Sequence, residues 1–226
     1  MDYVAVIPSC NRYDYLVAAV RSVLRQTLPP RAVWVVDDAS TDSRYRIAAE
    51  LSDPLVRLIR RPVGSKAATT TTYAIGTVRN TALVELLATP FDGWVAFLDD
   101  DDQWRPEKME ATAAVAAAHP DAVVIGTDAT VVNPAGDPIG FYGSVGGTLV
   151  ADELLDVTPV APYTNPLTCS TVAMPMRVIR QIGLMRPVGF CEDWDFWYRA
   201  SAHGRLLRIT RDLALYRKGH QKEWTL

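Results

Sequence analysis

Four consecutive aspartates, Asp99–Asp102, directly follow the apolar segment Trp94–Leu98. Adjacent carboxylates repel one another, and on an open loop such a run is usually no more than a solvated surface. The segment before this run is typical of a buried strand, which would hold the carboxylates at the edge of a sheet. A hard divalent cation such as Mg²⁺ or Mn²⁺ prefers oxygen ligands, often carboxylates shared with substrate phosphates. We therefore favour a metal site here over a solvated turn.

A metal at this position would act as a Lewis acid and neutralise the charge that grows on a departing diphosphate. Such chemistry implies transfer of a group from a phosphate-bearing donor. Two other acidic pairs stand out, Asp37-Asp38 after an apolar segment and Glu192-Asp193 at the start of a predicted helix. Each pair has a structural alternative, because Asp is favoured at helix caps and the helix dipole stabilises carboxylates in the first turn.

The elements that would position these groups begin with alternating strands and helices. Apolar segments predict strands and helical periodicity predicts helices, in the order Tyr3–Pro8, a helix over Asp14–Gln26 capped by Asp14, Ala32–Val36, a helix over about Ser43–Leu51, and Val56–Ile59. This βαβαβ order predicts a parallel sheet with right-handed crossovers. Because ligands bind at the carboxyl ends of such strands, the loops Ser9–Arg12 and Asp37–Asp42 should share one edge with the acidic run.

The rest of the chain continues the pattern less regularly. We predict helices over Thr77–Ala88, Pro106–Ala118, Val178–Ile182 and Glu192–Ala202, and strands over Trp94–Leu98, Ala122–Ile125, Leu206–Ile209 and Ala214–Tyr216. The turn signal Asn133–Asp137 indicates a hairpin, and Gly64–Thr72 and Gly140–Thr168 have no clear periodicity. The predicted class is α/β, a central mostly parallel sheet flanked by helices, with a small antiparallel element in the C-terminal half.

Composition indicates an ordinary globular protein of one domain. The chain has 226 residues, of which 49% are hydrophobic and 22% charged. Its net charge of -3 gives no reason to expect a nucleic-acid partner. The three cysteines, Cys10, Cys169 and Cys191, are too few and too scattered for a disulfide framework. Because no secretory leader or membrane-spanning run is apparent, we expect a soluble, cytoplasmic protein that can still bind peripherally to a membrane surface. The sequence does not fix the oligomeric state, and a homo-oligomer is one of the alternatives.

Taken in order, several segments resemble the family-2 glycosyltransferases, which have the Rossmann-like GT-A fold and invert the transferred sugar. The resemblance rests on Val4–Arg12, Ser22–Thr27, Val35–Asp42, Val78–Asn80, Phe97–Asp102 and Glu192–Arg199. It implies a single domain over residues 1–226, with a nucleotide-sugar-binding half at about 1–103. The acceptor-binding and catalytic-base half would lie at about 104–226.

The resemblance also implies roles for individual residues. Asp38 would hydrogen-bond the nucleotide base, commonly uracil, and the loop containing Pro8, Ser9, Asn11 and Arg12 would surround the base and ribose. Arg79 would contact the nucleotide, and Asp99 and Asp100 would lie beside the nucleotide sugar. Asp99 and Asp101 match the ends of the DXD motif and are candidate ligands of Mn²⁺ or Mg²⁺, while we expect Asp100 and Asp102 mainly to shape the loop. Many members of the family have a histidine after the next strand that helps to bind the metal or the diphosphate, and His220 is placed to do so as a further candidate ligand.

Asp193, with Glu192 beside it, matches the carboxylate that acts as general base. The expected reaction moves one sugar from a nucleoside-diphosphate sugar, expected to be a UDP-sugar, to a hydroxyl on a glycan, a lipid-linked acceptor or a protein. Two alternatives are a nucleotidyltransferase and a non-catalytic nucleotide-sugar-binding protein. The loop after the first strand contains no glycine, which disfavours the first alternative, and the second would not need Asp193. Compared with the family pattern, the segment Lys66–Ile75 is an insertion.

Overall fold

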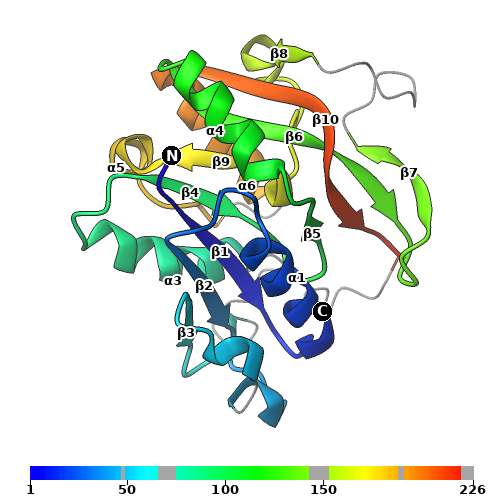
Figure 1. The fold of residues 1–226 in the computed structure, drawn as a ribbon. Coiled ribbons are helices and arrows are strands. Elements are labelled where there is room, and N and C mark those ends of the chain that lie inside the picture. Colours follow the sequence, from blue (N-terminus) through cyan, green and yellow to red (C-terminus); the bar gives the residue numbers. More distant parts are fainter. Residues whose placement is uncertain (47–48, 66–74, 143–152, 188–190, 220–226) are drawn as a thin grey trace.

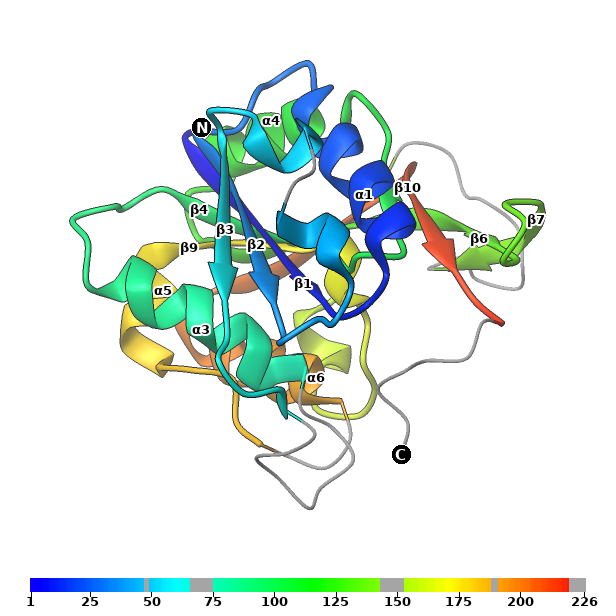
Figure 2. The same cartoon turned by 90° about the horizontal axis from the view of Figure 1, so that it is seen from below.

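The computed structural model describes residues 1–46, 49–65, 75–142, 153–187 and 191–219. In this part of the chain one sheet of ten strands runs through the molecule, in the order β3-β2-β1-β4-β9-β6-β10-β5 (Figure 1). The strand β7 pairs with β6, and β8 pairs with β10. The predicted α/β class is confirmed, and Figure 2 shows the helices that cover the sheet.

The first half of the sheet is parallel, as predicted. It consists of β1 (Tyr3–Ser9), β2 (Ala32–Asp37), β3 (Val56–Arg60) and β4 (Trp94–Phe97). The apolar segments end where the polar loops begin, so the carboxyl ends of β1, β2 and β4 lie on one rim. All seven residues of β1 are buried, which explains why the strand is apolar along nearly its whole length.

The second half of the sheet mixes directions. The strands β6 (Ala122–Val132) and β10 (Arg205–Arg217) are parallel to each other, and β9 (Ala173–Pro175) lies antiparallel between β4 and β6. Three further antiparallel strands are β5 (Gln103–Trp104), β7 (Pro138–Tyr142) and β8 (Leu154–Asp156). The predicted hairpin is confirmed, because β6 and β7 flank the turn at 133–137.

Two element predictions were wrong. The two short strands predicted near the C-terminus are one strand, β10, which shifts register on either side of Asp212 and so accommodates the polar residues that interrupt its apolar pattern. The predicted helix at 43–51 is instead two 3₁₀ turns, η1 (Ser43–Arg46) and η2 (Ala49–Ser52). Asp14 is not an N-cap either, since α1 begins at Tyr13 and places Asp14 in its first turn.

Helices cover both faces of the sheet, as Figure 2 shows. One face carries α1 (Tyr13–Leu24) and α4 (Lys108–Ala118), and the other carries α3 (Ile75–Leu87), α5 (Met176–Ile182) and α6 (Glu192–Ala200). Further 3₁₀ turns are η3 (Thr158–Val160), η4 (Cys169–Thr171) and η5 (Ser201–His203). Within the described residues, no helix is both long and apolar enough to cross a membrane.

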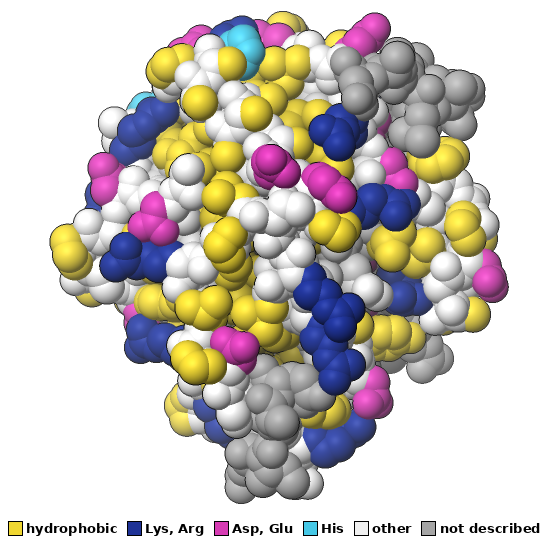
Figure 3. Space-filling model, viewed as in Figure 1, with side chains coloured by type: hydrophobic (Ala, Val, Ile, Leu, Met, Phe, Trp, Pro, Cys, Tyr) yellow, Lys and Arg dark blue, Asp and Glu magenta, His cyan; other side chains and the backbone are white. Residues whose placement is uncertain are grey.

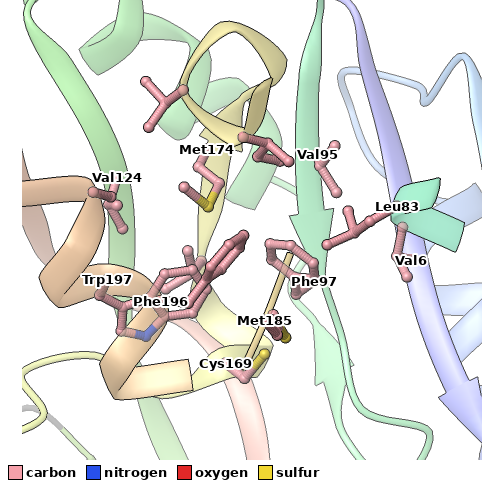
Figure 4. Close-up of a cluster of buried hydrophobic side chains, with 14 of the residues drawn as sticks. Val6, Leu83, Val95, Phe97, Val124, Cys169, Met174, Met185, Phe196 and Trp197 are labelled. Atoms are coloured by element: carbon pink, nitrogen blue, oxygen red, sulfur yellow. The ribbon is translucent and has the colours of Figure 1, made fainter. Parts of the chain in front are cut away.

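An aromatic cluster fixes α6 against the sheet (Figure 4). Phe97 at the end of β4 packs against Phe196 and Trp197 of α6, with ring centroids 6.4 and 5.9 Å apart. All three side chains are fully buried, so Trp197 belongs to the core. The strand that leads into the acidic run and the helix that begins with Glu192 are therefore held in a fixed relation by tight apolar packing.

Candidate active site

The acidic run turns back on itself at the rim. The backbone N–H of Asp102 donates to the carbonyl of Asp99 over 3.1 Å, and this turn brings their side chains to one side. Carboxylate oxygens of Asp99, Asp101 and Asp102 lie within 4.8 Å of one another. Burial and the charges of Asp101 and Asp99 raise the pKa of Asp102. Its Oδ2 is buried and accepts no well-aligned hydrogen bond among the described residues, although the Ser170 side chain opposes the rise in pKa, so this oxygen is available to a cation.

Asp102 was therefore undervalued by sequence reasoning. Its Oδ1 accepts a hydrogen bond from the backbone N–H of Arg217 over 2.7 Å, which ties the acidic run to the end of β10. The predicted pair Asp99 and Asp101 lies in the same group, which is compatible with the metal prediction. His220, the third predicted ligand, lies outside the described residues. The chemistry of three clustered carboxylates fits Mg²⁺ or Mn²⁺.

Asp100 points the other way, into the loop after β1. It accepts hydrogen bonds from Ser9 Oγ (2.7 Å) and Arg12 Nη1 (3.2 Å), and the same Arg12 nitrogen donates to Asp101 over 2.8 Å. Burial and the charge of Asp101 raise the pKa of Asp100 to about 7, although Arg12 opposes the shift. Asp100 thus holds loops together, as expected of a loop-shaping residue, and faces away from the three clustered carboxylates. A position of Asp100 beside the nucleotide sugar stays a prediction.

The loop after β1 is braced by groups that sequence reasoning missed. Tyr45 of η1 places its hydroxyl 2.6 Å from Ser9 Oγ and accepts a bond from the backbone N–H of Arg12. Asn11, in the left-handed region at φ 53°, accepts bonds from the backbone N–H groups of Thr41 and Asp42. Contact of Pro8, Ser9, Asn11 and Arg12 with a nucleotide stays a prediction, but their loop does lie beside the acidic run.

The acidic pair after β2 meets two arginines at the end of β3. Arg60 Nη1 donates to Asp37 over 2.6 Å, and Arg61 donates to Asp38. Asp38 also accepts bonds from the backbone N–H and hydroxyl of Ser65, and it is buried. Asp37 of β2 and Arg60 of β3 are partners in the strand register, so a correct alignment of the two strands could have indicated these ion pairs. Recognition of a base by Asp38 stays a prediction, with Arg61 now beside it.

Arg79 of α3 connects the acidic run to α6. The residue is 1% exposed, and its guanidinium donates to Asp99 over 2.5 Å and to Glu192 over 2.6 Å. A buried guanidinium between two carboxylates balances their charge and fixes their separation. Contact of Arg79 with the nucleotide stays a prediction, and the side chain couples the two halves of the site.

Asp193 lies in the first turn of α6, which follows the left-handed residue Cys191. Its Oδ2 accepts a bond from Asn165 Nδ2 over 3.2 Å, and its Oδ1 accepts one from the Trp194 N–H over 2.8 Å. Burial and the adjacent Glu192 carboxylate raise the pKa of Asp193 to about 6, although Arg79, Trp194 and Asn165 oppose the shift. Burial and the neighbouring charge therefore outweigh these opposing groups, and a carboxyl of this kind can accept a proton near neutral pH.

Two linked groups therefore occupy the rim, a set of clustered carboxylates suited to a cation and a carboxyl suited to proton transfer. Both adjoin the part of the molecule that the aromatic cluster holds rigid. On the face shown in Figure 3, acidic and basic side chains are interspersed among apolar ones.

Comparison with known proteins gives a consistent result. The model of the family "Glycosyl transferase family 2" matches residues 4–136. A curated relative from Escherichia coli, UDP-Glc:alpha-D-GlcNAc-diphosphoundecaprenol beta-1,3-glucosyltransferase WfgD, is 34% identical over 113 residues, which are 48% of this chain and 39% of the relative. The matches to four such relatives span between 28% and 39% of the relatives' lengths.

Solved structures share the fold over nearly the whole chain. The structure of S. aureus TarS 1-349 in complex with UDP-GlcNAc has a TM-score of 0.71 at 20% identity, and covers 99% of this chain and 60% of that one. GalNAc-T7 with UDP, GalNAc and Mn2+ has a TM-score of 0.71 at 14% identity, and covers 100% of this chain and 46% of that one. These likenesses concern the fold, and both structures are of GT-A glycosyltransferases.

Proposed function

The chain belongs to glycosyl transferase family 2, and we propose that it transfers one sugar, with inversion, from a UDP-sugar to an acceptor hydroxyl with the help of a divalent metal. One observation carries this proposal. A cluster of three carboxylates and a carboxyl with a raised pKa, Asp193, lie on one rim, and the buried Arg79 connects Asp99 of the cluster to Glu192, the residue before Asp193. Groups suited to the metal-binding and proton-accepting parts of a displacement at an anomeric carbon are thus side by side.

Asp99, Asp101 and Asp102 would hold the metal ion. When bound, Mn²⁺ or Mg²⁺ supplies positive charge next to the departing diphosphate. The buried Oδ2 of Asp102, which is available to a cation, supports this assignment, and so does GalNAc-T7, whose structure was solved with UDP, GalNAc and Mn2+. Arg12 and Arg79, which already pair with this group, limit the repulsion among its carboxylates.

Asp193 would accept the proton of the acceptor hydroxyl. Its pKa of about 6 leaves it ionised at neutral pH while keeping it basic enough to receive a proton. Asn165 and the Trp194 N–H orient the carboxylate, and Trp194 is itself fixed by donating to the carbonyl of Ala161 over 2.6 Å. A single displacement assisted by one base inverts the anomeric centre, so no covalent sugar intermediate is needed.

The donor is proposed to be a UDP-sugar. Asp38, Arg61 and the loop after β1 line the end of the rim that lies beside β2 and β3. The TarS structure is a complex with UDP-GlcNAc, and WfgD is named for UDP-Glc. The acceptor in WfgD's name is a diphosphoundecaprenol-linked sugar, so we propose that this chain also works on a glycan or lipid-linked hydroxyl, at the cytoplasmic side or surface of a membrane.

A thermal-shift panel tests the proposal. The purified chain would be heated with UDP, GDP, dTDP and ADP, each with and without Mn²⁺. We expect UDP to raise the Tm only when Mn²⁺ is present, because the diphosphate and the three carboxylates share the ion. Asp101→Asn should abolish the Mn²⁺-dependent part of the shift. A Tm unchanged by every nucleotide would refute the proposal, and a shift with another nucleotide would correct the donor base.

A further inference from the structure

Two tyrosines meet at the end of the sheet farthest from the β2–β3 edge. Tyr142 is the last residue of β7 and Tyr216 lies near the end of β10, and their ring centroids are 5.6 Å apart at an angle of 56°. Ala129 of β6 lies between Tyr142 and Ala214 in register, so Tyr142 shares a face with Ala214 and therefore with Tyr216 two residues on. The strands that carry the pair lie together in Figure 1.

Tyr216 lies close to the clustered carboxylates. The next residue, Arg217, donates its backbone N–H to Asp102 over 2.7 Å and its Nε–H to the carbonyl of Asp101 over 3.1 Å. Burial raises the pKa of Tyr216 first, and the charges of Asp102 and Asp99 raise it further. The ring therefore lies within the electrostatic field of the proposed metal group.

Tyr142 has the charge of the proposed base among its electrostatic neighbours. Burial is the main cause that raises its pKa, followed by the charge of Asp193. The ring pair thus lies beside the carboxylate cluster, to which Arg217 ties the end of β10, and the charge of Asp193 acts on it. This is the region in which an acceptor must lie if its hydroxyl is to reach Asp193 and the anomeric carbon together.

The two side chains have the chemistry of a sugar-binding surface. Both are only partly buried, and neither hydroxyl hydrogen-bonds to a residue in the described part of the chain. A cationic neighbour is Lys218, whose Nζ lies 5.6 Å from the Tyr216 centroid. An aromatic face can cover the C–H face of a pyranose ring, and phenol hydroxyls can bond its hydroxyl groups.

We propose that Tyr142 and Tyr216 form the acceptor platform, on which a pyranose ring of the acceptor stacks with its reacting hydroxyl towards Asp193. This inference rests on the proposed function and makes it more specific. It commits the acceptor to a saccharide unit. A protein side chain or a simple lipid alcohol would have no ring to place there.

The experiment measures UDP release from the donor sugar identified by the thermal-shift panel. Methyl pyranosides of glucose, galactose and N-acetylglucosamine serve as acceptor probes, and a threonine-containing peptide and octanol as non-saccharide probes. Tyr142→Ala and Tyr216→Ala are compared with Phe141→Ala, an aromatic control from the same strand that is 41% exposed and points to the opposite face. Tyr142→Phe and Tyr216→Phe retain the aromatic ring and serve as controls for the alanine variants. An effect confined to the alanine variants is due to loss of the ring.

We expect at least one pyranoside to accelerate UDP release, with its KM raised about tenfold in each alanine variant. The phenylalanine variants should keep most of the affinity, and Phe141→Ala should equal the unchanged chain. Hydrolysis of the donor without acceptor should be unaffected throughout. The inference is overturned if the pyranoside KM is unchanged in both alanine variants, or if only the peptide or octanol accelerates release. A chain that binds no nucleotide would instead refute the proposed function, so the two failures are distinguishable.

Discussion

Buried carboxylates are paired with arginines on one side of the site, whereas Asp193 on the other side has no such partner among the described residues. On the side of β1 to β4, four buried carboxylates are paired with arginines: Asp37 with Arg60, Asp38 with Arg61, and Asp100 and Asp101 with Arg12. On the side of α6, Asp193 accepts bonds from an amide and a backbone N–H. Outside the site, in the second half of the chain, Lys108 of α4 is also buried, with no carboxylate partner among the described residues. Pairs such as Asp212–Arg105 exist there, but not at these two groups.

The difference has a physical consequence for function. A guanidinium next to a buried carboxylate lowers the pKa of that carboxylate and fixes its position, although at Asp100 burial and the charge of Asp101 still raise the pKa to about 7. Among the described residues, Asp193 has no guanidinium partner and is held only by an amide and a backbone N–H, so its carboxyl, with a raised pKa, is the one placed to exchange a proton. The β1–β4 side is therefore suited to hold a ligand, and the α6 side to carry out a proton transfer. Arg79 contacts both sides, through Asp99 and Glu192.

Asp193→Asn should give the largest effect, because it removes the proposed proton acceptor. We expect kcat to fall about 1,000-fold, while the Mn²⁺-dependent Tm shift with UDP is retained because the β1–β4 side is untouched. For the unchanged chain, kcat/KM should fall about tenfold per pH unit below pH about 6, where Asp193 becomes protonated. Initial rates of UDP release across about pH 5–8 measure both effects.

The matched control is Asp195→Asn on the same helix. Asp195 pairs with Arg199 over 2.9 Å and does not take part in the proposed transfer, so its variant should keep nearly full activity. Equal loss in both variants would mean that the helix was disturbed rather than the base removed. Near-normal turnover of Asp193→Asn would exclude Asp193 as the base.

Arg79→Met should disturb both sides at once. Removing the guanidinium leaves Asp99 and Glu192 without compensation, and breaking such a buried pair costs about 3–5 kcal/mol. Because Arg79 lowers the pKa of Asp193, its loss should move the acidic limb of the pH–rate profile to higher pH. Urea denaturation and the pH profile check the two parts.

A surface arginine provides the comparison for this variant. Arg31 pairs with Asp2 where both side chains are at least half exposed, so Arg31→Met should cost under about 1 kcal/mol and leave the profile in place. If Arg79→Met lowered stability without moving the pH limb, Arg79 would be a structural residue only and the coupling between the two sides would be refuted.

The same contrast explains what the sequence could predict. On the β1–β4 side, each strand is a single apolar segment and each candidate group follows directly after it, so local patterns located the strands and Asp38, Asp99 and Asp101 together. What failed there was pairing across strands: Arg61 and Tyr45 reach the site through neighbouring elements, and only the strand register and the tertiary packing connect them to it.

On the other side, the important relations are distant in sequence. Asn165 contacts Asp193 across 28 positions, and β9 is a three-residue strand inserted between β4 and β6. Such a short strand has no periodicity to detect. The sequence also did not show that Asp102 belongs to the carboxylate cluster. A turn that brings Asp102 back to Asp99 cannot be distinguished in sequence from a turn that leaves Asp102 outside the cluster.

Asp101→Asn tests the β1–β4 side as a ligand holder. We expect Mn²⁺ to bind at least about tenfold more weakly in the presence of UDP, since one of three carboxylates loses its charge. Asp100→Asn is the neighbouring control, because that carboxylate bonds to Ser9 and Arg12 and faces away from the cluster. Calorimetric Mn²⁺ titrations would contradict the assignment if Asp100→Asn weakened binding more than Asp101→Asn.

Lys108→Met tests the unpaired cation, with the smallest expected effect. The Lys108 side chain lies over the Trp104 ring, its Nζ 4.6 Å from the centroid, and its hydrogen-bond acceptor among the described residues is Met109 Sδ at 3.8 Å. Burial lowers the pKa of Lys108 to about 7. Above that pH the folded chain holds Lys108 neutral, while the unfolded chain keeps it protonated up to its ordinary pKa of about 10.4.

Because the unfolded chain then binds the extra proton, the free energy of unfolding should rise with pH in this window. The expected gain is about 1.4 kcal/mol between about pH 8 and pH 9. Lys108→Met carries no such proton, so urea denaturation at the two pH values should show the gain only in the unchanged chain, with the variant the more stable at the lower pH. Parallel pH dependences would mean that Lys108 stays charged when folded. A charged Lys108 would need a group that balances its charge. The contrast between the arginine-paired carboxylates of the β1–β4 side and the unpaired groups Asp193 and Lys108 would then fail at Lys108.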